Sequence, residues 1–180
     1  MSNDIPGSHQ ADVHSTSAEG FNVRELRNAL GSFATGVTIV TTRSRDGKLH
    51  GMTANSFTSV SLDPMLVLVC VDYRARTLAL MEATDRFGIS VLAENQQALS
   101  DYFAGSDQDP QTAGPLGVRF RFSQHGTPLL EECLATLDCR KVSAHVAGDH
   151  TIFIGEVVDM DAVEGRPLLF YAGRYHRLGA

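Results

Sequence analysis

The chain lacks the sequence features of membrane-spanning and secreted proteins. No apolar run approaches the roughly 20 residues that a membrane-spanning helix needs. Residues 1–20 are polar and have no hydrophobic signal-peptide core, so we expect them to form a disordered tail. The three cysteines show no C-x-x-C spacing, which argues against a disulfide framework and against a zinc site. We therefore expect a cytoplasmic protein whose thiols are free.

The signatures of several common enzyme classes are missing as well. Neither G-x-G-x-x-G nor G-x-x-x-x-G-K-S/T occurs, which argues against a Rossmann or P-loop nucleotide site. Without G-x-S-x-G or H-E-x-x-H, serine hydrolases and zinc proteases lose their usual signatures. The formal net charge of −6 gives no electrostatic reason to expect a nucleic acid or an anionic membrane as partner. No third ligand accompanies His145 and His150 nearby in the sequence, so we expect no bound metal.

The composition that remains is typical of one compact domain. The chain has 180 residues, 43% of them hydrophobic and 20% charged, which is enough apolar material to bury a core. The sequence has no internal repeat and no sign of a second domain. We therefore assign residues 21–180 to a single domain that follows the tail.

Short β-rich segments separated by turns make up this domain. Asn22 and Glu25 resemble an N-cap and its reciprocal partner, and they predict a helix that ends at Gly36. Short helices are also expected at 77–84 and 95–103, and composition predicts a loop at 105–117. β-Branched and apolar runs predict strands at 37–42, 49–62 with a break near Asn55, 65–71, 87–92, 133–146, 151–160 and 168–171.

The predicted elements favour a mainly β fold. At least six strands are expected, several joined by tight hairpins, and the helices are too few to alternate with strands in a doubly wound sheet. Closure of an antiparallel sheet removes its exposed edges. We therefore expect a closed or nearly closed antiparallel barrel with a few peripheral helices. The run 65–71 is apolar on both faces and predicts a central strand.

The first candidate site is the segment G-M-T-A-N-S-F-T-S-V-S-L-D-P, residues 51–64. Small side chains let a flat ligand approach the backbone, and N–H and hydroxyl groups hydrogen-bond its polar edge. The spacing alone slightly favours a simpler interpretation, an irregular edge strand with a bulge at Asn55. The small or polar side chains of interest are Thr53, Ala54, Asn55, Ser56 and Ser59.

Two further candidate sites are charged turns. The segment 72–77 joins a strand to a helix start, where Arg74, Arg76 and backbone N–H groups are suited to bind a phosphate. A solvated loop with Thr77 as N-cap is the simpler interpretation of the same residues. The turn that ends at His150 lies between two long strands, and this histidine either contacts a dinucleotide or is a surface residue.

Four motifs occur in order along the chain: F-A-T-G-V-T-I-V-T-T, G-M-T-A-N-S-F-T-S-V-S-L-D-P, G-D-H-T-I-F-I-G-E-V and P-L-L-F-Y-A-G-R-Y-H-R-L. Together they resemble the short-chain flavin reductase family over residues 23–178. These are the reductase components of two-component flavin-dependent monooxygenases, and the phenol and 4-hydroxyphenylacetate hydroxylase reductases are the most similar. The resemblance implies a split, Greek-key-like β-barrel that binds FMN, usually as a homodimer, with the flavin in a groove near the subunit interface.

The resemblance also implies where the cofactors bind. The segment 53–56 would line the isoalloxazine and ribityl parts, 74–77 would hold the phosphate, and His150 would contact NADH. Ala75 stands where many relatives have a serine, which leaves more of the charge neutralisation to the two arginines. The implied cofactor contacts are His50, Gly51, Thr53, Ala54, Asn55, Ser56, Ser59, Arg74, Arg76, Thr77, Phe103, His150, Arg174 and Tyr175.

The implied activity is NADH-dependent reduction of FMN or FAD for a partner monooxygenase. Hydride would pass from nicotinamide C4 to flavin N5, so the protein positions two rings and needs no side-chain nucleophile. No additional basic cluster suits a 2′-phosphate, and we expect NADH to be preferred to NADPH. A flavin-dependent oxidase of the pyridoxamine-phosphate-oxidase type, or a non-catalytic flavin-binding module, would use the same barrel. The sequence leaves open the choice between FMN and FAD, whether the flavin is prosthetic or diffusing, and the oxygenase partner.

Overall fold

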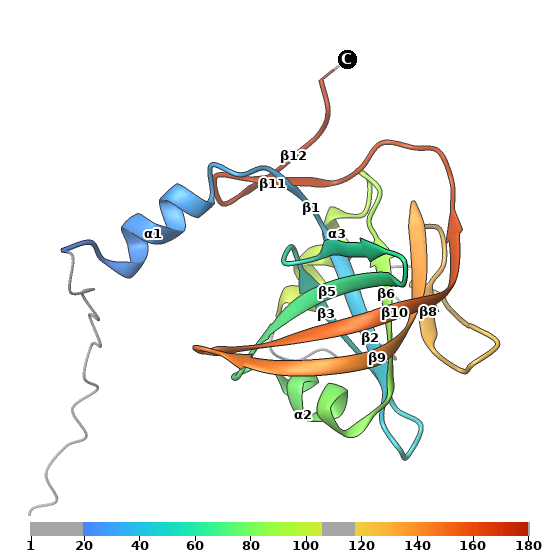
Figure 1. The fold of residues 1–180 in the computed structure, drawn as a ribbon. Helices are drawn as coiled ribbons and strands as arrows, with labels where there is room; N and C mark the ends of the chain where they lie inside the picture. The colour runs from blue at the N-terminus through green and yellow to red at the C-terminus, as the bar shows by residue number, and fades with distance from the viewer. Residues whose placement is uncertain (1–19, 106–117, 180) are drawn as a thin grey trace, which may run out of the picture.

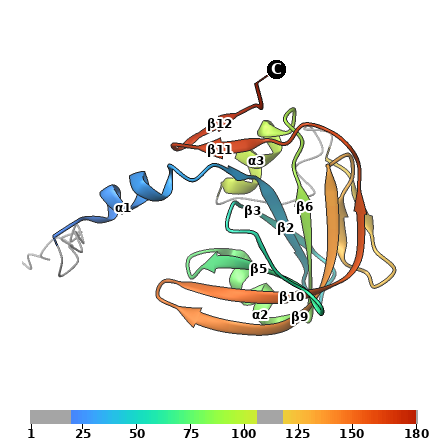
Figure 2. The same cartoon turned by 45° about the horizontal axis from the view of Figure 1, so that its top comes forward.

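The computed structural model describes residues 20–105 and 118–179 (Figure 1). The expected tail lies outside this part of the chain except for Gly20, and so does nearly all of the expected loop at 105–117. Strands dominate the described residues, and the helices lie at the periphery of the sheets (Figure 2). Within these two ranges, no helix combines the length and the apolar composition that crossing a bilayer requires.

Three helices were expected, and the first shows how a local signal can be right while its end is wrong. The helices are α1 (Val23–Leu30), α2 (Arg76–Ala83) and α3 (Gln97–Ala104). Asn22 and Glu25 form the predicted capping box, with backbone-to-side-chain bonds of 3.0 and 2.8 Å. The helix ends at Leu30, not at Gly36, because Gly36 pairs in a strand with Leu169. A partner that distant in sequence leaves no local signal.

The strands of the described residues form three antiparallel sheets. A seven-stranded sheet has the order β3-β2-β6-β9-β10-β5-β4, a three-stranded sheet the order β1-β11-β12, and β7 pairs with β8. The mainly β prediction is confirmed. The strands β1, β7, β8 and β12 were not predicted, because runs of two or three residues are too short to show periodicity. Their bounds are β1 (Thr35–Gly36), β2 (Thr38–Arg43), β3 (Leu49–Ala54), β4 (Thr58–Leu62), β5 (Met65–Asp72), β6 (Arg86–Val91), β7 (Phe120–Phe122), β8 (Pro128–Leu130), β9 (Ala135–Ala147), β10 (His150–Ala162), β11 (Leu169–Tyr171) and β12 (Arg174–His176).

Strand β5 does not occupy the central position that its apolar run predicted. It lies between β10 and the edge strand β4. Val67, Val69 and Val71 are buried in the core, whereas Leu66 and Leu68 on the other face are only half-buried. Apolar residues on both faces indicate partial burial of both faces, but they do not determine a strand's place in the sheet order.

One serine side chain fixes the connection between the two edge strands of the large sheet to β5. The edge strands β3 and β4 are consecutive in the chain, and Ser56 lies in the short connection between them. Its hydroxyl donates to the Cys70 carbonyl (3.0 Å) and accepts from the Cys70 N–H (3.1 Å). The side chain therefore continues the pairing with β5 beyond Thr58, the first residue of β4.

Two groups of buried side chains position the elements around the barrel. The larger group fills the barrel itself and includes Val40, Phe87 and Phe153. The smaller group includes Phe103 and Leu168 and packs α3 and the C-terminal strands against the outer wall. Helix α2 is tied to β9 because Lys141 Nζ donates to the carbonyls of Met81 (2.8 Å) and Glu82 (2.9 Å) at its last turn.

Candidate functional site

A cavity of about 550 Å³ opens between the large sheet, α2, α3 and the C-terminal strands. Its volume lies in the range of small-molecule and cofactor sites. Residues separated widely in sequence meet in its wall, from β3, from the start of α2, from α3 and from the β11–β12 hairpin. Nine of the residues implied by the family resemblance line it, namely His50, Gly51, Thr53, Asn55, Arg74, Arg76, Thr77, Phe103 and Tyr175.

The remaining five implied residues lie outside the cavity wall. Ala54 is buried in the core, and the Ser56 hydroxyl is occupied by the two bonds to Cys70. Ser59 is exposed on the edge strand β4, and Arg174 is exposed at the start of β12. Both predicted contact segments, 53–56 and 74–77, thus contribute to the cavity wall, but only some of their residues line it.

His150 lies beside the cavity, not in its wall. It begins β10 and is the register partner of Asp72, whose side chain lines the cavity. Its Nδ1 atom is 2.7 Å from Asp149 Oδ1, and the Asp149 carbonyl accepts a bond from Tyr73 N–H (3.0 Å). The hairpin therefore holds the imidazole next to the charged end of the cavity. The described residues contain no cluster of three or more potential metal ligands.

At one end of the cavity, Gly51 lets an aromatic ring pack directly on β3. A Cβ atom on Gly51 would lie 2.8 Å from Cε1 of Phe103, and that ring is fully buried. The sequence predicted that small residues here admit a flat ligand. The structure shows in addition that Gly51 is required for the position of the protein's own ring, which forms part of the cavity wall.

The same end is held together by Ser100 of α3, which the sequence analysis did not single out. The Thr53 hydroxyl donates to the Ser100 carbonyl (2.6 Å), and the Ser100 and Tyr175 hydroxyls are 2.8 Å apart. Burial raises the pKa of Tyr175, and the bond with Ser100 opposes this shift. A buried serine inside a helix has no sequence pattern that would have revealed this role.

At the other end, an aspartate engages one of the two predicted phosphate-binding arginines. Asp72 Oδ1 accepts from the Arg74 backbone N–H (2.7 Å) and from Nε (3.0 Å), while Oδ2 accepts from Nη2 (2.6 Å). These bonds hold the pKa of Asp72 well below its usual range and raise the pKa of Arg74. An aspartate two residues before an arginine is the local signal that predicts this turn.

Helix α2 presents an uncapped start to the cavity. The sequence suggested Thr77 as its N-cap, but the N-cap is Ala75, which has no side chain able to bond the first-turn N–H groups. Ala75, Arg76 and Thr77 all line the cavity, and the first turn contains no acidic residue. Backbone N–H groups at the positive end of the helix, with Arg76 beside them, form a donor set suited to a phosphate.

The mainly β barrel contains a cavity that extends from the cationic start of α2 to an aromatic wall. This arrangement defines a candidate binding site for a phosphorylated cofactor that contains a ring system. The model of the flavin reductase like domain matches residues 30–179. The chain therefore belongs to the flavin reductase-like family.

Similar proteins from several bacteria share this family. The chain is 47% identical over 155 residues to an NADH-dependent flavin reductase of Rhodococcus sp, covering 85% of each protein. It is 40% identical to HsaB of Rhodococcus jostii, the reductase subunit of a flavin-dependent monooxygenase, covering 88% of this chain and 79% of HsaB. The solved structure of the flavin reductase PheA2 superimposes with a TM-score of 0.81 at 42% identity, covering 89% of this chain and 100% of PheA2. An NADH:FAD oxidoreductase of Streptomyces globisporus, solved in complex with NAD and FAD fragments, gives a TM-score of 0.80 at 37% identity, covering 87% and 92%.

Proposed function

We propose that this protein is an NADH-dependent flavin reductase that supplies reduced FMN or FAD to a separate flavin-dependent monooxygenase. The observation that carries the proposal is the cavity itself, which has phosphate donors at one end and a packed aromatic wall at the other. The relatives named as NADH-dependent flavin reductase and as monooxygenase reductase subunit support the same activity.

The chain's own residues bind and orient the cofactors. Arg76 and first-turn N–H groups of α2 would hold the phosphate, and Phe103 and Tyr175 would line the ring end. Hydride transfer from nicotinamide C4 to flavin N5 is chemistry that the bound cofactors supply. With both cofactors bound, the residues of the cavity wall would orient the two rings for this transfer.

The donor set fits a phosphorylated flavin, and a single assay tests the activity. NADH oxidation should require added FMN or FAD, and NADPH should be a poorer substrate. Failure to consume NADH in the presence of either flavin, in a protein that melts cooperatively, would overturn the proposal. Flavin binding without turnover would favour the non-catalytic module, and oxidation of pyridoxamine phosphate would favour the oxidase.

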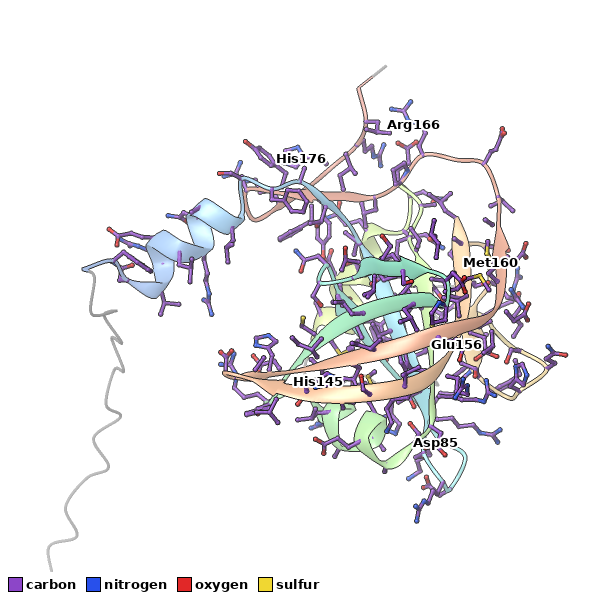
Figure 3. The ribbon with its side chains drawn as sticks, viewed as in Figure 1. Asp85, His145, Glu156, Met160, Arg166 and His176 are labelled. Carbon is purple, nitrogen blue, oxygen red and sulfur yellow. The ribbon has the colours of Figure 1, made fainter. Side chains whose placement is uncertain are left out.

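We also propose that the enzyme is a homodimer. Apolar side chains on the β4–β5 hairpin are exposed in the single chain, with Val60, Leu62 and Met65 at 46, 88 and 54%. Helix α1 has no buried residue, and its side chains stand clear of the barrel (Figure 3), with Leu26 and Leu30 exposed. Apolar surface of this extent is characteristic of a protein interface.

Light scattering of the purified protein tests this dimer. The parent should have twice the mass of one chain, and Leu62→Asp should be monomeric. Val163→Asp serves as the control, because Val163 is also exposed but follows β10 and lies outside the hairpin. A monomeric parent, or an unchanged mass in Leu62→Asp, would contradict an interface at β4–β5.

We place the enzyme in the cytoplasm, where its co-substrate NADH is available. Cys70, Cys133 and Cys139 are free thiols, which suits a reducing compartment. Burial raises the pKa of Cys139 to about 12, so this thiol is chemically inert. Fractionation of cells that express the native gene, followed by immunoblotting, tests the assignment.

A further inference from the structure

Ser100 links three elements that form the ring end of the cavity. It is fully buried on α3, and its N–H, its carbonyl and its hydroxyl are all hydrogen-bonded. Its carbonyl accepts from Thr53 of β3 (2.6 Å), and its hydroxyl is 2.8 Å from the Tyr175 hydroxyl of β12. Thr53, Ser100 and Tyr175 all line the cavity, so Ser100 connects the part of the wall from β3 with the part from β12.

The two sides of this link differ in how firmly they are built. Strand β3 belongs to the seven-stranded sheet and pairs along its whole length with β2. Strand β12 is a three-residue edge strand whose neighbour β11 pairs with the two-residue strand β1. The Tyr175 ring packs edge-on against Phe170, 5.4 Å between centroids, within the same small hairpin. The hairpin therefore depends on contacts outside its own sheet to hold its position over the cavity.

We infer that Ser100 is a positioning residue that sets the distance between Tyr175 and β3, and thereby the fit of the isoalloxazine ring. The inference rests on the proposed flavin reductase function. Figures 1 and 2 place α3 and the β11–β12 hairpin at the opposite side of the molecule from α2, whose start carries the phosphate donors. Ser100 thus acts on the part of the ligand that every flavin shares.

Two substitutions remove the same hydrogen bond from its two ends. Ser100→Ala deletes the hydroxyl but keeps the carbonyl that Thr53 binds, so the α3–β3 contact is retained. Tyr175→Phe deletes the other hydroxyl and keeps the ring that packs on Phe170. Each variant should raise the dissociation constants of FMN and riboflavin by the same factor, about three- to tenfold, since one buried hydrogen bond is lost.

The double variant Ser100→Ala/Tyr175→Phe separates positioning from independent contributions. If Ser100 acts through Tyr175, the double variant binds flavin no more weakly than the worse single variant. The flavin's fluorescence, which a nearby tyrosine ring quenches, should be less quenched when bound to Ser100→Ala than when bound to the parent. Arg76→Ala at the phosphate end is the contrasting variant, and it should weaken FMN binding more than riboflavin binding.

Several results would overturn the inference. They are unchanged flavin affinity in Ser100→Ala, losses that multiply in the double variant, or a loss for FMN that riboflavin does not share. Thermal melting identifies a variant that fails to fold, and Tyr175→Phe then provides the test, because its hydroxyl lies at the less buried end of the bond. A parent protein that binds no flavin would instead reject the proposed function and leave no role for Ser100 to test.

Discussion

The two ends of the cavity are built in different ways. The end proposed to bind the phosphate comes from one short stretch, residues 72–77, in which Asp72 bonds Arg74 and Ala75 is the N-cap of α2. The ring end joins Gly51, Ser100 and Tyr175, which lie far apart in the chain. The first end is mostly charged and exposed, whereas the second is buried and packed. From this comparison we expect residues that are neighbours in the sequence to set the affinity for a phosphate, and contacts between distant segments to set the fit of a ring.

The largest effect should come from filling the space at Gly51. Gly51→Val would force the buried Phe103 ring away from β3 and should lower the free energy of unfolding by about 1–3 kcal/mol. Flavin affinity should fall by at least about tenfold, for FMN and riboflavin alike, because the wall itself moves. Calorimetry and flavin titration measure the two effects. Gly36→Ala is the matched control, since its Cβ would meet nothing within 4 Å.

A substitution at the proposed phosphate end should affect flavin binding without a comparable loss of stability, and with a different selectivity between flavins. Arg76→Ala should raise the dissociation constant of FMN by about ten- to a hundredfold, because a charge-assisted bond to the phosphate is lost. Riboflavin, which has no phosphate, should be affected far less. Titration of both flavins measures the ratio. Equal losses for FMN and riboflavin would show that Arg76 supports the cavity as a whole and does not act on the phosphate.

Arg74 lies in the same stretch but should matter less. Its guanidinium is already paired with Asp72, and the pair is exposed to solvent. Arg74→Ala should therefore raise the dissociation constant of FMN by only about two- to threefold. An effect as large as that of Arg76→Ala, in the same titration, would mean that the phosphate displaces Asp72 from Arg74.

His150 lies beside the charged end of the cavity, and its loss should affect the binding of neither FMN nor riboflavin strongly. Its place next to Asp72 at the cavity margin suits a contact with the nicotinamide nucleotide. His150→Ala should raise the Michaelis constant for NADH by about three- to tenfold, the loss expected for one hydrogen bond. Stopped-flow reduction at varied NADH measures this change. A fall in flavin affinity would place the histidine in the flavin site, and no change at all would make it a turn residue.

The local features of the fold could be predicted from the sequence. The Asn22–Glu25 capping box depends on neighbouring residues alone, and it is present. The two long strands at the end of the chain were also expected, because each keeps a continuous β pattern. Strand pairings such as Gly36 with Leu169 were not predictable, because nothing near Gly36 indicates its partner.

The residues of the candidate site likewise divide into those with a local sequence signal and those whose role depends on contacts between distant segments. The arginine-bearing loop was located from the resemblance and from its local charge, although the engagement of Arg74 by Asp72 was missed. Ser100 was missed altogether, because its importance arises from β3 and β12 meeting at one side chain. Ser56 was expected to face the flavin, yet its hydroxyl is used in the barrel's own hydrogen bonding.

The uncapped start of α2 offers a way to detect whether flavin is bound to the protein. No side chain caps the start of α2, so a ligand oxygen that accepts from N–H groups of its first turn, beyond the bond that Leu78 N–H already makes to the Ala75 carbonyl (3.0 Å), would slow their exchange with solvent. Their hydrogen–deuterium exchange should therefore slow when FMN binds and recover when it leaves, while the far end of the helix, bonded to Lys141, changes little. Exchange at the start of α2 is therefore a signal for bound flavin, and exchange at the far end of the same helix is its internal reference. The signal would change when flavin reaches the enzyme and again when it passes on to the oxygenase.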